Sequence, residues 1–318
     1  MPPYHGSMQP AFSVTLAGMV AFTVAGCFHA RAQAPGVPIC RQTGQESQYT
    51  ARLLGDAKKL FAADKAIKLA QVRIELKRTS CQLTLPKASK QKLPAREICI
   101  AARHGHLRVG WSYLCDKCGN WHLKLAGGYI LTTQGEVATC FHVIEPGPEV
   151  RDGCLVAVDE EGAVFPVAEV LAANPESDAC IVRVAGGEFK PLPLNTNVYP
   201  GDTVYCYSDP VEHRDYFSAG IVNRFYQLGA SRAAGARASA AIAPTRINVS
   251  TDWAPGSSGS AVLDECGNVI GHVAKISSVR DESTPKAQDS SAEKPAAMVF
   301  HEAVSARDVL RLTRPRRD

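Results

Sequence analysis

A tight turn rich in glycine and serine stands directly before a strand-like run in Thr251-Asp252-Trp253-Ala254-Pro255-Gly256-Ser257-Ser258-Gly259-Ser260-Ala261-Val262. A glycine at 256 allows the turn to direct backbone N–H groups toward one point. The hydroxyl of a serine such as Ser258 is a weak nucleophile at neutral pH and needs a base within hydrogen-bond reach. The turn therefore raises the question of where the chain supplies a base.

Two other stretches supply a histidine and a carboxylate. The first is Ala138-Thr139-Cys140-Phe141-His142-Val143, and the second is Ser177-Asp178-Ala179-Cys180-Ile181-Val182-Arg183-Val184. A histidine can take the serine proton and return it to a leaving group, and a buried carboxylate fixes the histidine tautomer. We therefore interpret His142, Asp178 and Ser258 as a triad, with the amides of Gly256 and Ser258 as oxyanion donors.

Short segments dominate the chain from His106 onward. About twelve strand-like runs separated by turns extend to Met298–Val304, which predicts an all-β barrel or sandwich. Helical periodicity covers Glu46 to about Phe61, and shorter helices are expected from Ala95 and from Ser305, a good N-cap. The run from 72 to 76 permits either strand or helix.

Residues 97–314 resemble a trypsin-like (chymotrypsin-fold) serine peptidase and are most similar to bacterial exported enzymes of the Deg/HtrA type. The resemblance rests on the three stretches above and on shorter matches at Gly127–Ile130, Gly201–Val204, Ser218–Val222 and Gly267–Gly271. It implies two six-stranded antiparallel β-barrels, at about 104–190 and 195–304, with a helical N-terminal extension and a short C-terminal helix. His142 and Asp178 would come from the first barrel and Ser258 from the second.

The same resemblance implies a serine endopeptidase that cleaves polypeptides through an acyl-enzyme and needs no cofactor. Ser257 occupies the place of the aspartate that activates animal trypsins, so that activation route is not expected, and no PDZ domain is expected after the last helix. Two alternatives stay open. One is a catalytically silent binding or scaffold protein of the cell envelope, and the other is an esterase that uses the same residues.

Substrate specificity is read from positions near the nucleophile. Asp252 lies six residues before Ser258, the spacing at which trypsins hold the carboxylate that binds Arg or Lys, although it could also cap a loop. His272 stands one residue after Gly271, whereas glutamate-specific relatives place a histidine two residues after it. The edge that pairs with substrate backbone is predicted at Ala274, Lys275 and Ile276.

The N-terminus predicts export. Ala11–Phe28 is an uncharged apolar stretch, and Ala32-Gln33-Ala34 offers a signal-peptidase site, which makes residues 1–34 a signal segment. Val24-Ala25-Gly26-Cys27 alternatively resembles a lipobox with Cys27 lipidated, and a retained membrane helix is the third reading. Each places the rest of the chain outside the cytoplasm, as a periplasmic, envelope-anchored or secreted protein.

The charge is unevenly distributed. Residues 41–96 carry 13 Lys/Arg against 4 Asp/Glu, a net of +9, whereas the whole chain carries +4. The overall charge is too small to predict a nucleic-acid partner. Residues 35–96 are interpreted as a basic, partly helical accessory segment, with solvated helix faces, docking on the rest of the chain or docking on an anionic surface as alternatives. The oligomeric state is left open.

Eleven cysteines form no obvious framework. The turn Cys115-Asp116-Lys117-Cys118-Gly119 has the pattern of a zinc knuckle. A disulfide or two free thiols is favoured over zinc at Cys115 and Cys118, because a structural site needs four ligands. His122 and Cys140 are possible further ligands, but the spacing does not require them.

Overall fold

The computed structural model describes residues 45–229, 243–280 and 296–313. The chain divides into the units 1–41 and 42–318, and all the described residues belong to the second. The predicted signal, lipobox and membrane stretches lie outside the described residues. Within the described ranges, no helix is both long enough and apolar enough to cross a membrane.

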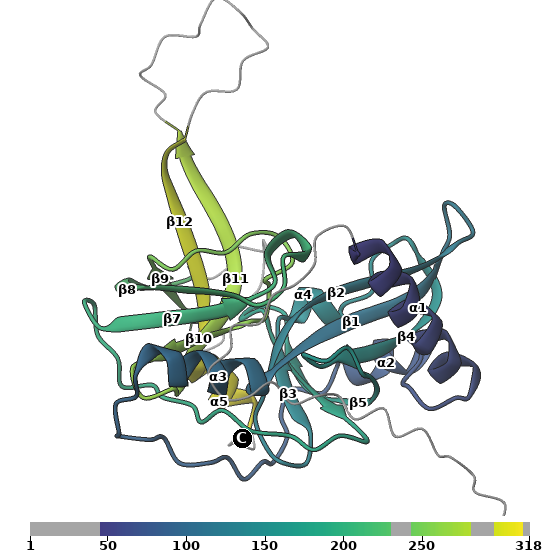
Figure 1. Cartoon of the computed structure of the whole chain (residues 1–318), viewed down its shortest axis with the longest axis horizontal. Coiled ribbons are helices and arrows are strands. Elements are labelled where there is room, and N and C mark those ends of the chain that lie inside the picture. The colour runs from purple at the N-terminus through teal and green to yellow at the C-terminus, as the bar shows by residue number, and fades with distance from the viewer. Residues whose placement is uncertain (1–44, 230–242, 281–295, 314–318) are drawn as a thin grey trace, which may run out of the picture. The chain divides into compact units, whose positions relative to one another are not determined.

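Two closed antiparallel barrels of six strands each form the body of this unit (Figure 1). The first has the strand order β1-β2-β3-β6-β5-β4 and the second β10-β11-β12-β9-β8-β7. The prediction of two six-stranded barrels is confirmed. The strands of the first barrel are β1 (His106–Cys115), β2 (Trp121–Ile130), β3 (Glu136–Thr139), β4 (Val150–Val158), β5 (Val164–Asn174) and β6 (Ala179–Val184). Those of the second are β7 (Thr203–Ser208), β8 (Tyr216–Gln227), β9 (Thr245–Val249), β10 (Ala261–Asp264), β11 (Val269–Arg280) and β12 (Ala296–Ser305).

Apolar side chains fill each barrel and also join the two. One buried cluster, with Val109, Leu155 and Val182, lies in the first barrel, and another, with Val204, Ile247 and Val262, lies in the second. A third cluster combines residues of both barrels, including Tyr129, Ala138, Ile181, Tyr207 and Leu263. Alternation along a strand sends neighbouring residues to opposite faces, so one strand can serve both its own barrel and the junction between barrels.

The basic segment packs on the first barrel through two helices, α1 (Glu46–Ala62) and α2 (Leu69–Glu75). Ala57 of α1 is buried with Cys154 and Val156 of β4. The run at 72–76 is therefore mainly helical. Leu69 and Val72, three residues apart on one helix face, both join the core of the first barrel. Among the alternatives for this segment, the packing of α1 and α2 favours docking on the rest of the chain.

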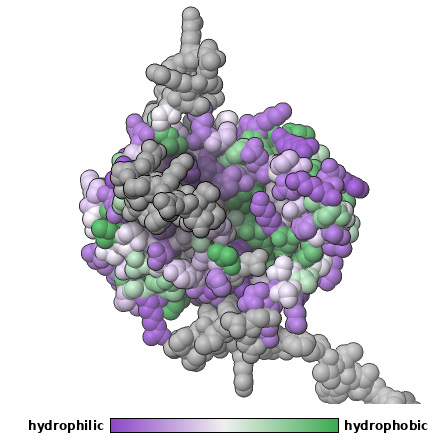
Figure 2. Space-filling view, turned by 90° about the horizontal axis from the view of Figure 1, so that it is seen from above, coloured by the Kyte–Doolittle hydropathy of each residue, from purple (hydrophilic) through white to green (hydrophobic). Residues whose placement is uncertain are grey.

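The remaining short elements connect or cover the barrels. They are α3 (Ala95–Gly105), the single turn α4 (Phe141–Ile144), the 3-10 turn η1 (Pro210–Glu212) and α5 (Ala306–Leu312). The Ser305 hydroxyl accepts from the Arg307 amide, as its prediction as an N-cap requires. The Lys-rich stretch at 86–94 runs along the second barrel, where the Ser89 amide donates to Asn268. Figure 2 shows one face of the molecule, on which apolar residues gather among mostly hydrophilic ones.

Candidate active site

His142 and Asp178 are hydrogen-bonded partners in the first barrel. His142 lies on α4, the turn that follows β3, and Asp178 lies immediately before β6. The Nδ1 atom of His142 is 2.9 and 3.0 Å from the two carboxylate oxygens of Asp178. The His142 amide also donates to this carboxylate, at 3.1 Å. Burial acts to raise the pKa of Asp178, but the hydrogen bonds and charge of His142 outweigh it and lower the pKa.

Two side chains of the second barrel contact backbone carbonyl oxygens at and next to Asp178. Asp178 adopts a left-handed conformation with φ 55°, which is uncommon for a residue other than glycine. The Nε2 atom of His272, on β11, lies 3.2 Å from the Asp178 carbonyl oxygen. Arg246, on β9, donates to the carbonyl oxygen of Ser177 at 3.2 Å. These contacts fix the carboxylate facing His142.

The turn with Ser258 is tied to β11 and packed against β2. The Gly259 amide donates to the Val273 carbonyl at 2.8 Å, and the Val273 amide donates to the Ser260 carbonyl at 2.9 Å. A side chain at 259 would collide with the Gly127 carbonyl, so only glycine fits there. This close approach places the second barrel's serine turn against the first barrel.

The amides of Gly256 and Ser258 are available for an oxyanion. Their neighbours Ser257 and Gly259 donate to carbonyls, whereas Gly256 and Ser258 donate to no described residue. Gly256 has φ 101°, a conformation that favours glycine. Among the described residues, the two N–H groups of the predicted donor pair therefore have no acceptor and could both donate to an oxyanion.

One pocket is shared by the catalytic candidates. His142, Gly256 and Ser258 line it together with residues of β1, β2 and the loop before β4, among them Trp111, Tyr113, Lys124 and Glu149. Within the described residues, the Ser258 hydroxyl makes no hydrogen bond to His142. Such contacts are often loose without substrate and tighten when it binds.

The predicted specificity residues do not line this pocket. Asp252 is exposed, and its backbone is held by the Ser218 hydroxyl at 3.1 Å. Ala274, Lys275 and Ile276 lie on β11 beyond the end of its pairing with β10, which stops at His272. On that side of β11, no described strand pairs with them, whereas β12 pairs on the other side. Their backbone therefore offers an open strand edge.

Helix α1 contacts the loop that supports the Gly256 backbone. The centre of the Tyr49 ring lies 3.8 Å from the Arg214 guanidinium carbon, and the Tyr49 hydroxyl accepts a hydrogen bond from Arg108. The Arg108 Nε atom lies 3.7 Å from a carboxylate oxygen of Asp209. Asp209 belongs to the same loop as Arg214. The Val211 amide of this loop donates to the Pro255 carbonyl at 2.7 Å, next to Gly256. The accessory segment is thus connected to Gly256, the predicted oxyanion donor, through the loop that contains Val211 and Arg214.

Comparison with known families identifies the domain that carries this geometry. The family model described as a trypsin-like peptidase domain matches residues 126–271, a range that contains His142, Asp178 and Ser258. The chain contains a trypsin-like peptidase domain. Together with the two six-stranded barrels, this match bears out the resemblance to a trypsin-like peptidase that the sequence indicates.

Two further similarities concern individual proteins. The chain is 28% identical over 154 residues to an uncharacterized protein, y4bJ, of Sinorhizobium fredii. That match covers 46% of this chain and 21% of y4bJ, so the chain spans about a fifth of its relative's length. The crystal structure of the serine endoprotease from Yersinia pestis matches with a TM-score of 0.46 and 14% identity. This match covers 70% of the present chain and 65% of that one.

Sequence reasoning missed two buried groups beside the candidate triad of this domain. The sequence suggests a bearing of His272 on specificity alone, yet this side chain is fully buried against the Asp178 backbone. The sequence offers Cys140 as a further ligand beside Cys115 and Cys118, but it lies beside Asp178 and His142, and its thiol donates to the Val273 carbonyl at 3.1 Å. That expectation for Cys140 is wrong, because β3 directs Cys140 into the barrel junction. No local pattern in the sequence signals either contact.

Proposed function

We propose that this chain is a serine endopeptidase that hydrolyses peptide bonds through an acyl-enzyme. Ser258 is the nucleophile, His142 is the general base and then the general acid, and Asp178 orients His142. The observation that carries the proposal is the pair of Nδ1–carboxylate contacts between His142 and Asp178, beside a pocket that His142 shares with Ser258.

The chemistry follows from this arrangement. The Ser258 Oγ attacks the peptide carbonyl carbon while His142 Nε2 takes the hydroxyl proton. The carbonyl oxygen becomes an oxyanion, which the amides of Gly256 and Ser258 stabilise by roughly 3–4 kcal/mol each. Collapse of the tetrahedral intermediate breaks the C–N bond, and His142 protonates the leaving amine. Water then attacks the ester with His142 again as base, which releases the acid and restores Ser258.

A fluorophosphonate probe tests this proposal, because it reacts with a serine activated by its base. We expect labelling of the full chain, and loss of labelling in Ser258→Ala and in His142→Ala. Ser257→Ala is the matched control, since the Ser257 hydroxyl is buried and the probe cannot reach it. A folded chain that does not label, or that labels equally without Ser258, would contradict the proposal. Labelling with ester cleavage but no peptide cleavage would identify the esterase instead.

The substrate is bound, in this proposal, by its backbone along the open edge of Ala274, Lys275 and Ile276, as an added strand. Asp252 selects Arg or Lys at the cleavage site, because a cationic side chain is the natural partner of a carboxylate. Cleavage of a peptide library by wild type and Asp252→Asn tests this choice. A cleavage preference that is the same in both proteins would remove Asp252 from the specificity pocket.

The proposal also includes export, on the apolar stretch 11–28 and the small residues at 32–34. The N-terminus of the mature protein separates the three routes. A terminus at Pro35 supports signal-peptidase cleavage, a lipidated Cys27 supports a lipoprotein, and an intact Met1 in the membrane fraction supports an anchor. An unprocessed chain in the soluble cell fraction would contradict export.

A further inference from the structure

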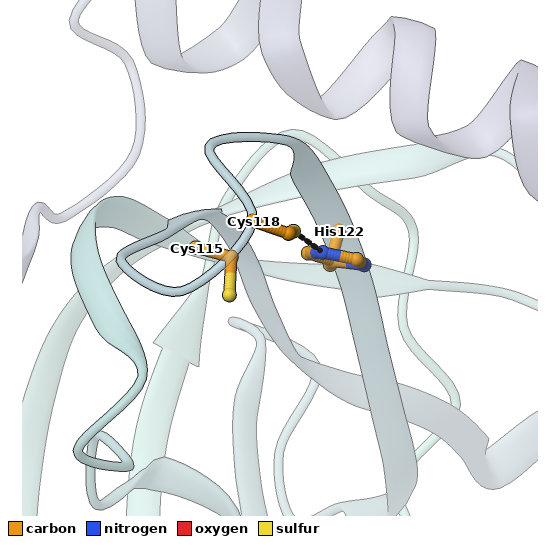
Figure 3. A group of neighbouring side chains, drawn as sticks. All are labelled: Cys115, Cys118 and His122. Carbon is orange, nitrogen blue, oxygen red and sulfur yellow. Dashed lines mark hydrogen bonds between the residues drawn. The ribbon is translucent and has the colours of Figure 1, made fainter.

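A cluster of soft metal-binding groups lies at the tip of the β1–β2 hairpin, outside the triad. Cys115 ends β1, Cys118 lies in the turn, and His122 lies on β2 (Figure 3). One donor atom of each residue lies within 4.8 Å of the donor atoms of the other two. The Cys118 Sγ and His122 Nε2 atoms are 3.0 Å apart.

The backbone of this turn is built to bring the two sulfurs together. The Cys115 amide donates to the Asn120 carbonyl at 2.9 Å, and the Gly119 amide donates to the Cys115 carbonyl at 3.0 Å. Gly119 has φ 70°, which closes the turn. The turn therefore keeps the Cys115 and Cys118 sulfurs within 4.8 Å of each other.

The position of His122 is fixed by the hairpin register. Tyr113 of β1 pairs with His122 of β2, and their rings lie 5.4 Å apart. The imidazole thus reaches the knuckle from the neighbouring strand. In a tetrahedral zinc site, with bonds of about 2.3 Å to sulfur and 2.0–2.1 Å to nitrogen, donor atoms lie roughly 3.5–3.8 Å apart. The separations in the turn need only small side-chain rotations to meet these values.

We propose that Cys115, Cys118 and His122 bind one Zn²⁺ ion, with water in the fourth position. A site of two thiolates and an imidazole favours Zn²⁺ over Ca²⁺ or Mg²⁺, which bind oxygen ligands. Two thiolates also balance the charge of the ion. Cys118 and His122 are exposed, which leaves the fourth position open to solvent. The set satisfies the three protein ligands and one water that an open zinc site requires.

The zinc site has a consequence for the neighbouring pocket, which rests on the proposed function. Tyr113 contacts His122 on one side and lines the pocket of His142 and Ser258 on the other. A bound ion therefore fixes the strand that forms one wall of that pocket. Its removal should raise the KM for peptide substrates about two- to ten-fold, while the rate of fluorophosphonate labelling of Ser258 changes little.

Metal binding is measured on the full chain with Ser258→Ala, so the result does not depend on peptidase activity. The reduced, metal-free protein is titrated with Co²⁺, whose thiolate charge-transfer absorption reports sulfur ligands, and Zn²⁺ then displaces it. We expect one ion per chain, with at least ten-fold weaker binding in Cys118→Ser and in His122→Ala. Cys266→Ser, which alters a partly exposed thiol in the β10–β11 turn, is the matched control and should bind like the parent.

Three results would overturn the zinc site. One is the absence of a thiolate–cobalt band in the reduced chain. Another is unchanged binding in both Cys118→Ser and His122→Ala, each shown to be folded by circular dichroism. The third is a Cys115–Cys118 disulfide that forms under air even with Zn²⁺ present, because a bound ion protects its thiolates from oxidation. A binding defect with normal peptidase activity would uphold the site and reject only its effect on the pocket.

Discussion

The buried His272 predicts that the fold loses stability as the pH falls from 6.5 toward 4. Burial lowers the pKa of this histidine to about 4, and the charges of Arg246 and His142 act in the same direction. The charge of Asp178 and its carbonyl oppose the shift but do not overcome it. Tyr129, whose hydroxyl is 3.5 Å from Nδ1, completes the surroundings. The folded protein therefore holds His272 neutral.

The size of the effect follows from proton linkage. In the unfolded chain the imidazole has its ordinary pKa of 6.5, so between pH 6.5 and about 4 the unfolded state binds a proton that the folded state does not. The contribution of the neutral His272 to the free energy of unfolding is therefore fully present above pH 6.5 and is lost as the pH falls toward 4. The two pKa values differ by about 2.5, and each pKa unit corresponds to about 1.4 kcal/mol. The free energy of unfolding is therefore lower by roughly 3 kcal/mol near pH 4.

Urea unfolding of the full chain across this pH range, in a Ser258→Ala background that prevents self-cleavage, measures the loss. His272→Gln keeps an N–H donor for the Asp178 carbonyl but cannot titrate. We expect the free energy of unfolding of the variant to fall by roughly 3 kcal/mol less than that of the parent over the window. His213→Gln, at an exposed histidine, is the matched control and should follow the parent. Equal slopes in His272→Gln and parent would refute the reasoning, as would a folded-state titration of His272 near pH 6.5.

Three further predictions concern the support of the site. Gly256→Ala places a Cβ 3.0 Å from the Asp209 carbonyl at φ 101°, so kcat should fall roughly 10²-fold as one oxyanion donor is misplaced; an unchanged kcat would contradict the donor role. Tyr49→Ala removes the contact between α1 and the loop beside Gly256, and the fluorophosphonate labelling rate should drop roughly ten-fold, whereas a drop below two-fold would disconnect α1 from the site. Ile181→Ala empties a fully buried position at the barrel junction and should cost about 2–5 kcal/mol in urea unfolding; a cost under about 1 kcal/mol would mean that the junction refills.

The parts of the fold that depend on local patterns could be predicted from the sequence. The strand-like runs from His106 onward correspond to the strands of the two barrels, because alternation and turn residues act over a few positions. The bounds expected for a strand are too narrow where its pairing with a neighbouring strand extends past the apolar run. β4 begins at Val150, ahead of the apolar run that starts at Cys154, and the polar Asp152 still pairs with Leu114 of β1. The run at 72–76 could not be assigned, because its helix depends on packing against the barrel.

The candidate site could be predicted in its residue types and order, but not in its surroundings. His142, Asp178 and Ser258 stand in stretches whose local chemistry is distinctive, and the structure brings His142 and Asp178 into contact and Ser258 into the same pocket. The roles of His272 and Tyr49 depend on contacts with residues more than fifty positions away along the chain. No pattern within a single stretch contains that information.

By itself, then, the sequence predicted an all-β fold, a helical N-terminal extension and a candidate triad in the order His142, Asp178 and Ser258. Tertiary structure alone decided that His272 is buried beneath Asp178 and that Cys118 and His122 meet at a hairpin tip. It also decided that α1 reaches the loop beside Gly256. The physical reason is the range of the forces involved. Turn and strand preferences act between neighbours in sequence, whereas burial and side-chain contact arise only when barrel closure and strand register bring distant segments together.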